Sequence, residues 1–150
     1  MNKGISYIPE GSTALQERFI NSIMKCGKKS TARRIFKDAF VEIANQGGQD
    51  PERTFEKAIE NVKPTMEVRP KRIGGAVYQI PVEVKPGRQM SLTFRWIIGA
   101  ARMSKGRPMA IKLASVLIEA ANGAGPAVKK RDDVHKMAQA NKAFAHFAKY

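Results

Sequence analysis

The chain has 150 residues, of which 27 are lysine or arginine and 13 are aspartate or glutamate, so its formal net charge at pH 7 is +14. This length suits one domain, and the charge predicts a polyanionic partner, with nucleic acid favoured over an anionic membrane. We find no apolar run of the roughly 18 residues that a membrane-spanning helix needs, no signal-peptide pattern, and a single cysteine, Cys26, which excludes an intrachain disulfide.

Three helices are predicted in the first part of the chain. Residues 1–12 are expected to form an N-terminal arm, and residues 13–150 a single helical domain. The apolar spacing predicts a helix over residues 13–25, a second that is capped by Ser30 or Thr31 and ended by two glycines at 47–48, and a third over residues 51–63. Asp50 before a proline is the cap signal of this third helix.

The hydrophobic period changes to two after residue 64, which indicates strands. Apolar side chains alternate with other residues at Tyr78, Ile80, Val82 and Val84. Gly74 and Gly75 lie between two extended runs and predict a tight turn, since glycine adopts positive φ freely. We therefore expect a two-stranded ribbon at about residues 65–86, and prolines in both strands mark each as an edge.

Helical periodicity returns after the ribbon. We expect a fourth helix over residues 89–104, a fifth over 108–122, and a sixth that follows a link at 123–126. Asp132 and Asp133 are expected in the first turn of this sixth helix, where acids suit the helix dipole. Its buried side is expected to carry Val134, Met137, Ala138 and Phe144. The predicted fold is mainly α, with six helices and a protruding β-ribbon between the third and fourth.

The charges are segregated along the chain. Residues 84–118 contain no acid, and residues 38–67 hold seven of the 13 acids. Helical spacing places Arg95 and Arg102 on one face about 10 Å apart, with Gly99 between them and Arg88 at the entrance. The predicted cationic surface also includes Lys28, Lys29, Arg33, Arg34, Lys71, Arg72, Lys105 and Arg107. A single lysine is more often just a solvated charge, but a long acid-free span predicts nucleic-acid contact.

Folded RNA is the favoured partner, because no helix-turn-helix, zinc spacing or basic zipper is present. Tyr78 is the best candidate for stacking on a base, whereas Trp96 is expected in the core. Two alternatives remain open: a DNA-architectural protein, which would bind duplex DNA as well as RNA, and a basic membrane-surface protein, which would expose large apolar side chains opposite a cationic face.

No catalytic, metal or cofactor site is predicted. His135 and His146 stand beside neither Cys26 nor a serine elbow, and they are expected to be hydrogen-bonded or to face RNA. No glycine pattern matches a phosphate-binding loop.

Several runs resemble one known family in order. They are Phe19-Ile-Asn-Ser-Ile-Met24 with Gly27-Lys-Lys-Ser-Thr31, Glu60-Asn-Val-Lys-Pro64, Tyr78-Gln-Ile-Pro-Val-Glu-Val84, Arg95-Trp-Ile97 with Ala100-Ala-Arg102, and Asp133-Val-His-Lys-Met-Ala138 with Ala140-Asn-Lys-Ala-Phe-Ala-His146. Over residues 13–147 the chain resembles the universal small-subunit ribosomal protein seven, in its bacterial and organellar form.

The resemblance implies direct binding of small-subunit ribosomal RNA, nucleation of head-domain assembly, and a place in a bacterial or organellar ribosome. It implies neighbours among the ribosomal proteins of the head and platform, and no membrane partner. It also implies that the ribbon and the last helix approach the exit-site tRNA and the mRNA. The residues expected on that side are Gly74, Gly75, Tyr78, His135, Lys136 and Asn141.

Overall fold

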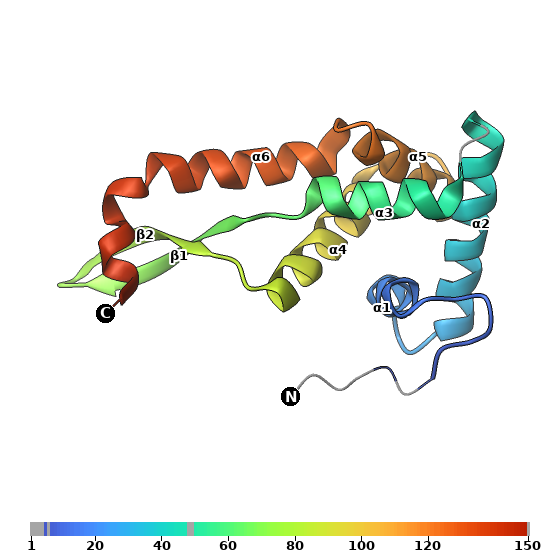
Figure 1. Cartoon of the computed structure of the whole chain (residues 1–150), viewed down its shortest axis with the longest axis horizontal. Coiled ribbons are helices and arrows are strands. Elements are labelled where there is room, and N and C mark those ends of the chain that lie inside the picture. The colour runs from blue at the N-terminus through green and yellow to red at the C-terminus, as the bar shows by residue number, and fades with distance from the viewer. Residues whose placement is uncertain (1–4, 6, 48–49, 150) are drawn as a thin grey trace.

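The computed structural model describes residues 5, 7–47 and 50–149, and within them six α-helices precede and follow one two-stranded antiparallel sheet, with a 3-10 helix at the end. In chain order the elements are α1 (Ala14–Ile23), α2 (Lys29–Gly47), α3 (Pro51–Val62), β1 (Met66–Ile73), β2 (Ala76–Glu83), α4 (Pro86–Met103), α5 (Met109–Ala121), α6 (Gly125–Ala140) and η1 (Lys142–Lys149). Figure 1 shows a helical body of α1–α5, from which the ribbon and α6 extend together. The predicted fold class is confirmed. Residues 1–4 and 6 of the predicted arm and Gly48 lie outside the described residues.

The helix boundaries follow local capping chemistry. Thr13 caps α1, because its Oγ1 accepts a hydrogen bond from the backbone N–H of Gln16 at 3.2 Å. Asp50 caps α3 before Pro51, as predicted. The predicted cap of the second helix at Ser30 or Thr31 is wrong, because α2 already begins at Lys29. Cys26 and Gly27 both have positive φ, 54° and 70°, and this sharp turn lets α2 begin sooner.

Four phenylalanine rings from four helices meet in the core. Phe19 of α1 lies 5.1 Å from Phe55 of α3 and 5.2 Å from Phe94 of α4, between ring centroids. Phe36 of α2 lies 5.5 Å from Phe55. Edge-to-face pairs of this kind contribute about 0.5–1.5 kcal/mol beyond the area that they bury. The cluster fixes α1 against α4, and this contact sets the geometry of the basic surface described below.

The ribbon has the predicted turn. Gly74 and Gly75 connect a strand pair whose last partners are Ile73 and Ala76, and their φ angles are 57° and 85°. Positive φ at both central residues is the requirement of the tightest hairpin turn. The sheet of the described residues has two strands, so both are edges, as the prolines predicted.

The C-terminal region differs from its prediction. Since α6 begins at Gly125, with a proline in its first turn, Asp132 and Asp133 lie about two turns further along, and their predicted place in the first turn is wrong. Met137 is 51% exposed rather than buried. Phe144 lies on η1 and packs against the ribbon instead of the body, because the helix ends at a cap on Asn141.

Candidate nucleic-acid interface

A groove between α1 and α4 forms a strongly cationic hollow on the described surface. Its volume is about 570 Å³. Arg95, Gly99 and Arg102 of α4 line it, since spacings of four and three residues place them on one helix face. The groove also takes in Gly87 and Ser91 of α4 and Arg18, Asn21 and Ser22 of α1. No acid lies among its described lining residues. We call it the α1–α4 groove.

Small residues keep the α1–α4 groove open. A Cβ atom added at Gly87 or Gly99 would meet no described atom within 4 Å. Their missing side chains therefore leave space above the helix backbone, at Gly99 between Arg95 and Arg102 and at Gly87 in the first turn of α4. A phosphate can approach such a surface closely and meet guanidinium groups from both sides, which is how arginine recognises phosphate.

Arg102 connects the α1–α4 groove to a second hollow. This hollow, of about 270 Å³, lies at the α1–α2 connection and is lined by Lys25 and Lys28 as well as Arg102. The Nη2 atom of Arg102 donates to the carbonyl oxygen of Ile23 at 3.1 Å, so the guanidinium is held across the end of α1. The predicted cations of the first loop and of α4 are thereby brought onto one continuous surface.

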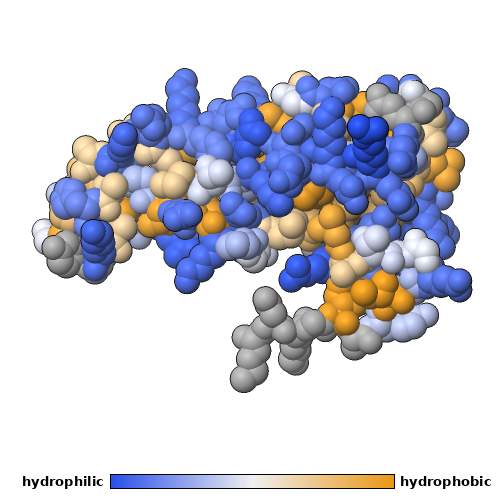
Figure 2. All heavy atoms as spheres, in the orientation of Figure 1, coloured by the Kyte–Doolittle hydropathy of each residue, from blue (hydrophilic) through white to orange (hydrophobic). Residues whose placement is uncertain are grey.

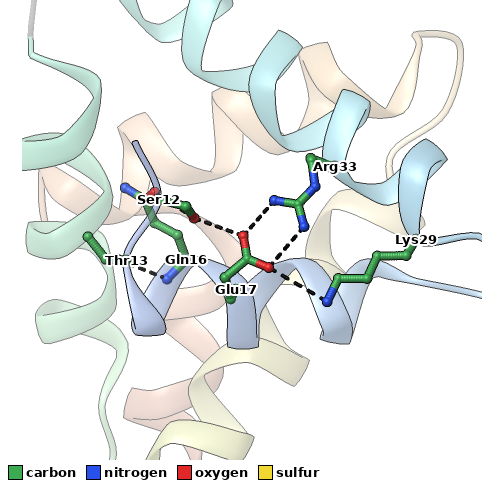
Figure 3. A network of polar contacts seen from close by, with 6 residues as sticks. All are labelled: Ser12, Thr13, Gln16, Glu17, Lys29 and Arg33. Atoms are coloured by element: carbon green, nitrogen blue, oxygen red, sulfur yellow. Dashed lines mark hydrogen bonds and ion pairs between the residues drawn. The ribbon is translucent and has the colours of Figure 1, made fainter. Parts of the chain in front are cut away.

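Arg33 and Lys29 point toward a buried carboxylate (Figure 3). Glu17 is fully buried, and Arg33 binds its Oε1 and Oε2 at 2.6 and 3.0 Å. Ser12 donates to Oε1 at 2.8 Å, and the Nζ atom of Lys29 lies 3.6 Å from Oε2. The hydrogen bond from Arg33 holds the pKa of Glu17 below its usual value, against the opposing effect of burial. Arg33, predicted as an RNA contact, therefore has a structural partner inside the fold.

Glu67 holds the start of α4 to the base of the ribbon. Its carboxylate is buried, and the Nε atoms of Arg69 and Arg88 donate to it at 2.8 and 3.3 Å. Arg88 was predicted at the entrance of the helix face that carries Arg95 and Arg102, and its side chain remains 42% exposed. It does not line the α1–α4 groove.

The C-terminal segment covers part of the ribbon. The Nζ atom of Lys71 donates to the carbonyl oxygen of Phe147 at 3.1 Å. The ring of Tyr78 packs against those of Phe144 and Phe147, with centroids 5.2 and 5.5 Å away. Both ribbon residues were predicted to face nucleic acid, and both are half-buried under η1.

His135 joins α6 to the base of the ribbon. Its Nε2 atom accepts a hydrogen bond from the backbone N–H of Thr65 at 3.0 Å, which requires that Nε2 carries no proton. Burial lowers the pKa of His135, and the nearby Arg131 lowers it further, while Asp132 opposes them. Asn141 is also engaged, because its side-chain nitrogen donates to the carbonyl oxygen of Met137 at 2.8 Å. Lys136 is exposed.

The remaining predicted cations are exposed and have no carboxylate within ion-pair distance among the described residues. They are Lys28, Arg34, Arg72, Lys105 and Arg107. Gly74 and Gly75 are exposed at the ribbon tip.

Arg18 was missed by the sequence analysis. It precedes Asn21 and Ser22 at helical spacing on the polar face of α1, and that pattern was the available signal. In the part of the chain that the structure describes, no group of three or more His, Cys, Asp or Glu residues could hold a metal ion. None of the described helices is long and apolar enough to cross a membrane.

The fold and the α1–α4 groove define a mainly helical, strongly basic protein with a surface suited to a polyanion. Residues 3–142 match the family model described as ribosomal protein S7p/S5e, and the chain belongs to this family. The resemblance noted in the sequence is thereby confirmed.

Three bacterial relatives show how far the similarity extends, and each is named small ribosomal subunit protein uS7. The protein of Pseudothermotoga lettingae is 51% identical over 92% of this chain and 89% of its own length. That of Moorella thermoacetica is 55% identical over 87% of this chain and 83% of its own. That of Rhodopirellula baltica is 51% identical over 93% and 90%.

Proposed function

We propose that this chain is a structural constituent of the small ribosomal subunit that binds ribosomal RNA of the head domain directly and nucleates its assembly. The observation that carries the proposal is the α1–α4 groove, in which Arg18, Arg95 and Arg102 line an acid-free hollow. The names of the relatives support the assignment to the small ribosomal subunit. Their bacterial sources favour a bacterial over an organellar ribosome.

The RNA surface in this proposal extends from the groove to the exposed cations around it. Arg102 links the groove to Lys28 at the α1–α2 connection. Arg34, Lys105 and Arg107 are exposed, and Lys29 and Arg88 keep part of their side chains accessible beside their internal carboxylates. Phosphate contacts then provide most of the affinity, and the shape of the folded RNA provides the register.

The second part of the proposal concerns the ribbon and α6. The ribbon tip, with Arg72 and Gly74, extends away from the helical body (Figure 1), and Lys136 is exposed on α6. This arrangement suits a probe that reaches the exit-site tRNA and the mRNA while the body is anchored on ribosomal RNA. Ribosomal proteins of the head and platform would be its protein neighbours.

A filter-binding comparison tests the proposal. The full chain is titrated with three competitors of equal length: a transcript of the small-subunit head domain, an unrelated structured RNA and duplex DNA. Preference for the head transcript supports the proposal, and if about six phosphates are contacted, the log–log salt slope is −4 to −5. Equal affinity for duplex DNA would instead favour the DNA-architectural alternative, and a slope near zero would exclude phosphate-dominated binding.

A further inference from the structure

The stretch from the second half of α2 through α3 to the start of the ribbon carries a net charge of the opposite sign to the rest of the chain. Residues 38–67 contain seven acids and three bases, in a protein whose net charge is +14. One of these acids, Glu67, is buried in the ribbon base. Of the other six, Glu60 alone forms an ion pair among the described residues, with Lys63 at 2.8 Å. RNA is repelled by such a surface, so the acids suit a different partner.

An apolar groove opens beside these acids. It has a volume of about 380 Å³ and lies between α2 and residues 9–12 of the N-terminal arm, and we call it the arm–α2 groove. Phe36, Phe40 and Val41 line it from α2, and Ile20 lines it from α1. Phe40 packs on Phe36 with ring centroids 4.3 Å apart, so the hollow reaches the rim of the aromatic core.

Large apolar side chains around this hollow are exposed. Val41 is 60% exposed, and Ile8, next to the lining residue Pro9, is 44% exposed. Figure 2 shows a patch of hydrophobic surface at the end of the molecule that carries α1 and the arm, whereas hydrophilic side chains cover most of α3 and α6 on the same face. An exposed patch with a charged rim is typical of a protein-binding surface.

The rim of the arm–α2 groove is acidic. Glu10 and Glu52 line it and have no ion-pair partner among the described residues. Arg33 also lines it, but its guanidinium is bound to Glu17. Lys37 is the remaining basic lining residue of the described chain, so the acids outnumber the available cations.

We propose that the arm–α2 groove docks an extended basic segment of another protein. Apolar side chains of this segment fill the hollow at Phe40 and Val41, and its lysines or arginines meet Glu10 and Glu52. Alternation of apolar and basic residues suits an extended chain, whose successive side chains point to opposite sides. In the proposed function, the arm–α2 groove would bind one of the neighbouring ribosomal proteins. The proposal rests on that function only because it requires both proteins to be present in the same ribosomal particle.

The test measures binding of a labelled extended peptide, in which lysine alternates with valine, to the full chain by fluorescence anisotropy. We expect binding that Val41→Ser weakens about tenfold, since the few residues whose truncation costs most affinity cluster near the centre of an interface. Glu52→Gln should weaken it as well. Val77→Ser is the matched control, because Val77 is 63% exposed on the ribbon, and this variant should bind the peptide as the wild type does.

Three results would overturn the inference. One is equal peptide affinity in Val41→Ser and Val77→Ser. Another is equal affinity for a peptide with glutamate in place of lysine. The third is a concentration-dependent dimer that Val41→Ser abolishes, which would make a second copy of this chain the occupant. Affinity for the head-domain transcript is measured in the same variants and should not change, so failure here is distinguishable from failure of the proposed RNA binding.

Discussion

Arg33 binds both carboxylate oxygens of the fully buried Glu17, at 2.6 and 3.0 Å. The two residues lie on different helices, α2 and α1, so the pair ties the first two helices together. Arg34, the next residue, is exposed and has no carboxylate partner among the described residues. Adjacent arginines therefore have different roles, one inside the fold and one at its surface.

Replacing each of these arginines by methionine should separate the two roles. Arg33→Met should lower the free energy of unfolding by about 3 kcal/mol or more, because the buried carboxylate of Glu17 loses the cation that binds both its oxygens and keeps only the more distant Lys29. Arg34→Met should change stability by less than about 0.5 kcal/mol, as exposed substitutions usually do, and should weaken RNA binding. Urea denaturation and filter binding measure the two effects. Equal stability of the two variants would contradict the structural role of Arg33.

The same pair predicts a pH dependence of stability. The pKa of Glu17 is held below its usual value of about 4.5, so the folded state favours the ionised form more than the unfolded state does. Its stabilising contribution is therefore complete above pH 4.5 and is lost as the pH falls through the lower pKa of the folded state. The difference in unfolding free energy between the wild type and Glu17→Gln should be constant at neutral pH and should shrink in acid. A difference that grows as the pH falls would refute this assignment.

The α1–α4 groove predicts which arginines carry the salt dependence of RNA binding. Arg18→Ala and Arg95→Ala should each weaken binding to the head-domain transcript and reduce the salt slope by about 0.7–0.9, since each removes one phosphate contact. Arg53→Ala is the control, because Arg53 is exposed but lies on the acid-rich α3. Filter binding at several salt concentrations measures the slope. If all three variants gave the same slope, the groove would not be the RNA surface.

The sequence alone predicted the relative positions of residues correctly where a single helix or hairpin determines them. Arg95 and Arg102 were predicted on one face, and they line one groove, because the period of a single helix fixes their relation. The ribbon was predicted for the same reason, since the two glycines and the alternation of apolar residues lie within one local segment. Arg18 joins this groove only through the packing of α1 on α4, which no local pattern specifies.

Long-range contacts also explain why other predicted nucleic-acid residues have partners inside the protein. Arg33 meets Glu17, and Lys71 meets the backbone of Phe147, over sequence separations that charge patterns do not reveal. One signal was available, since Glu17 lies three residues before Ile20 on the apolar side of its helix, where an acid needs a cation. The identity of that cation depends on the tertiary fold.

The ribbon tip can be shortened without disturbing its base. In the observed register Lys71 pairs with Tyr78, two residues before the last pair, Ile73 with Ala76, so both pairs have the same hydrogen-bonding pattern. Replacing residues 72–77 by Asn-Gly therefore leaves a two-residue turn directly after the pair of Lys71 and Tyr78. The contacts of Lys71 and Tyr78 with η1 are retained. We expect unchanged thermal unfolding and unchanged binding of the head-domain transcript, because neither the core nor the α1–α4 groove is altered. Ribosomes reconstituted with this variant should show altered retention of exit-site tRNA or altered maintenance of the reading frame.

A length-preserving variant provides the control for this experiment. Replacing Gly74 by asparagine keeps the turn type, since asparagine tolerates the φ of 57° found there, and this variant should behave as the wild type in all assays. Loss of RNA binding in the shortened variant would show that the tip belongs to the main anchor on ribosomal RNA. Normal tRNA retention and normal frame maintenance in both variants would show that the tip does not act as a probe, and the proposed role of the ribbon would then have to be assigned to its base, where His135 and Glu67 connect it to α6 and α4.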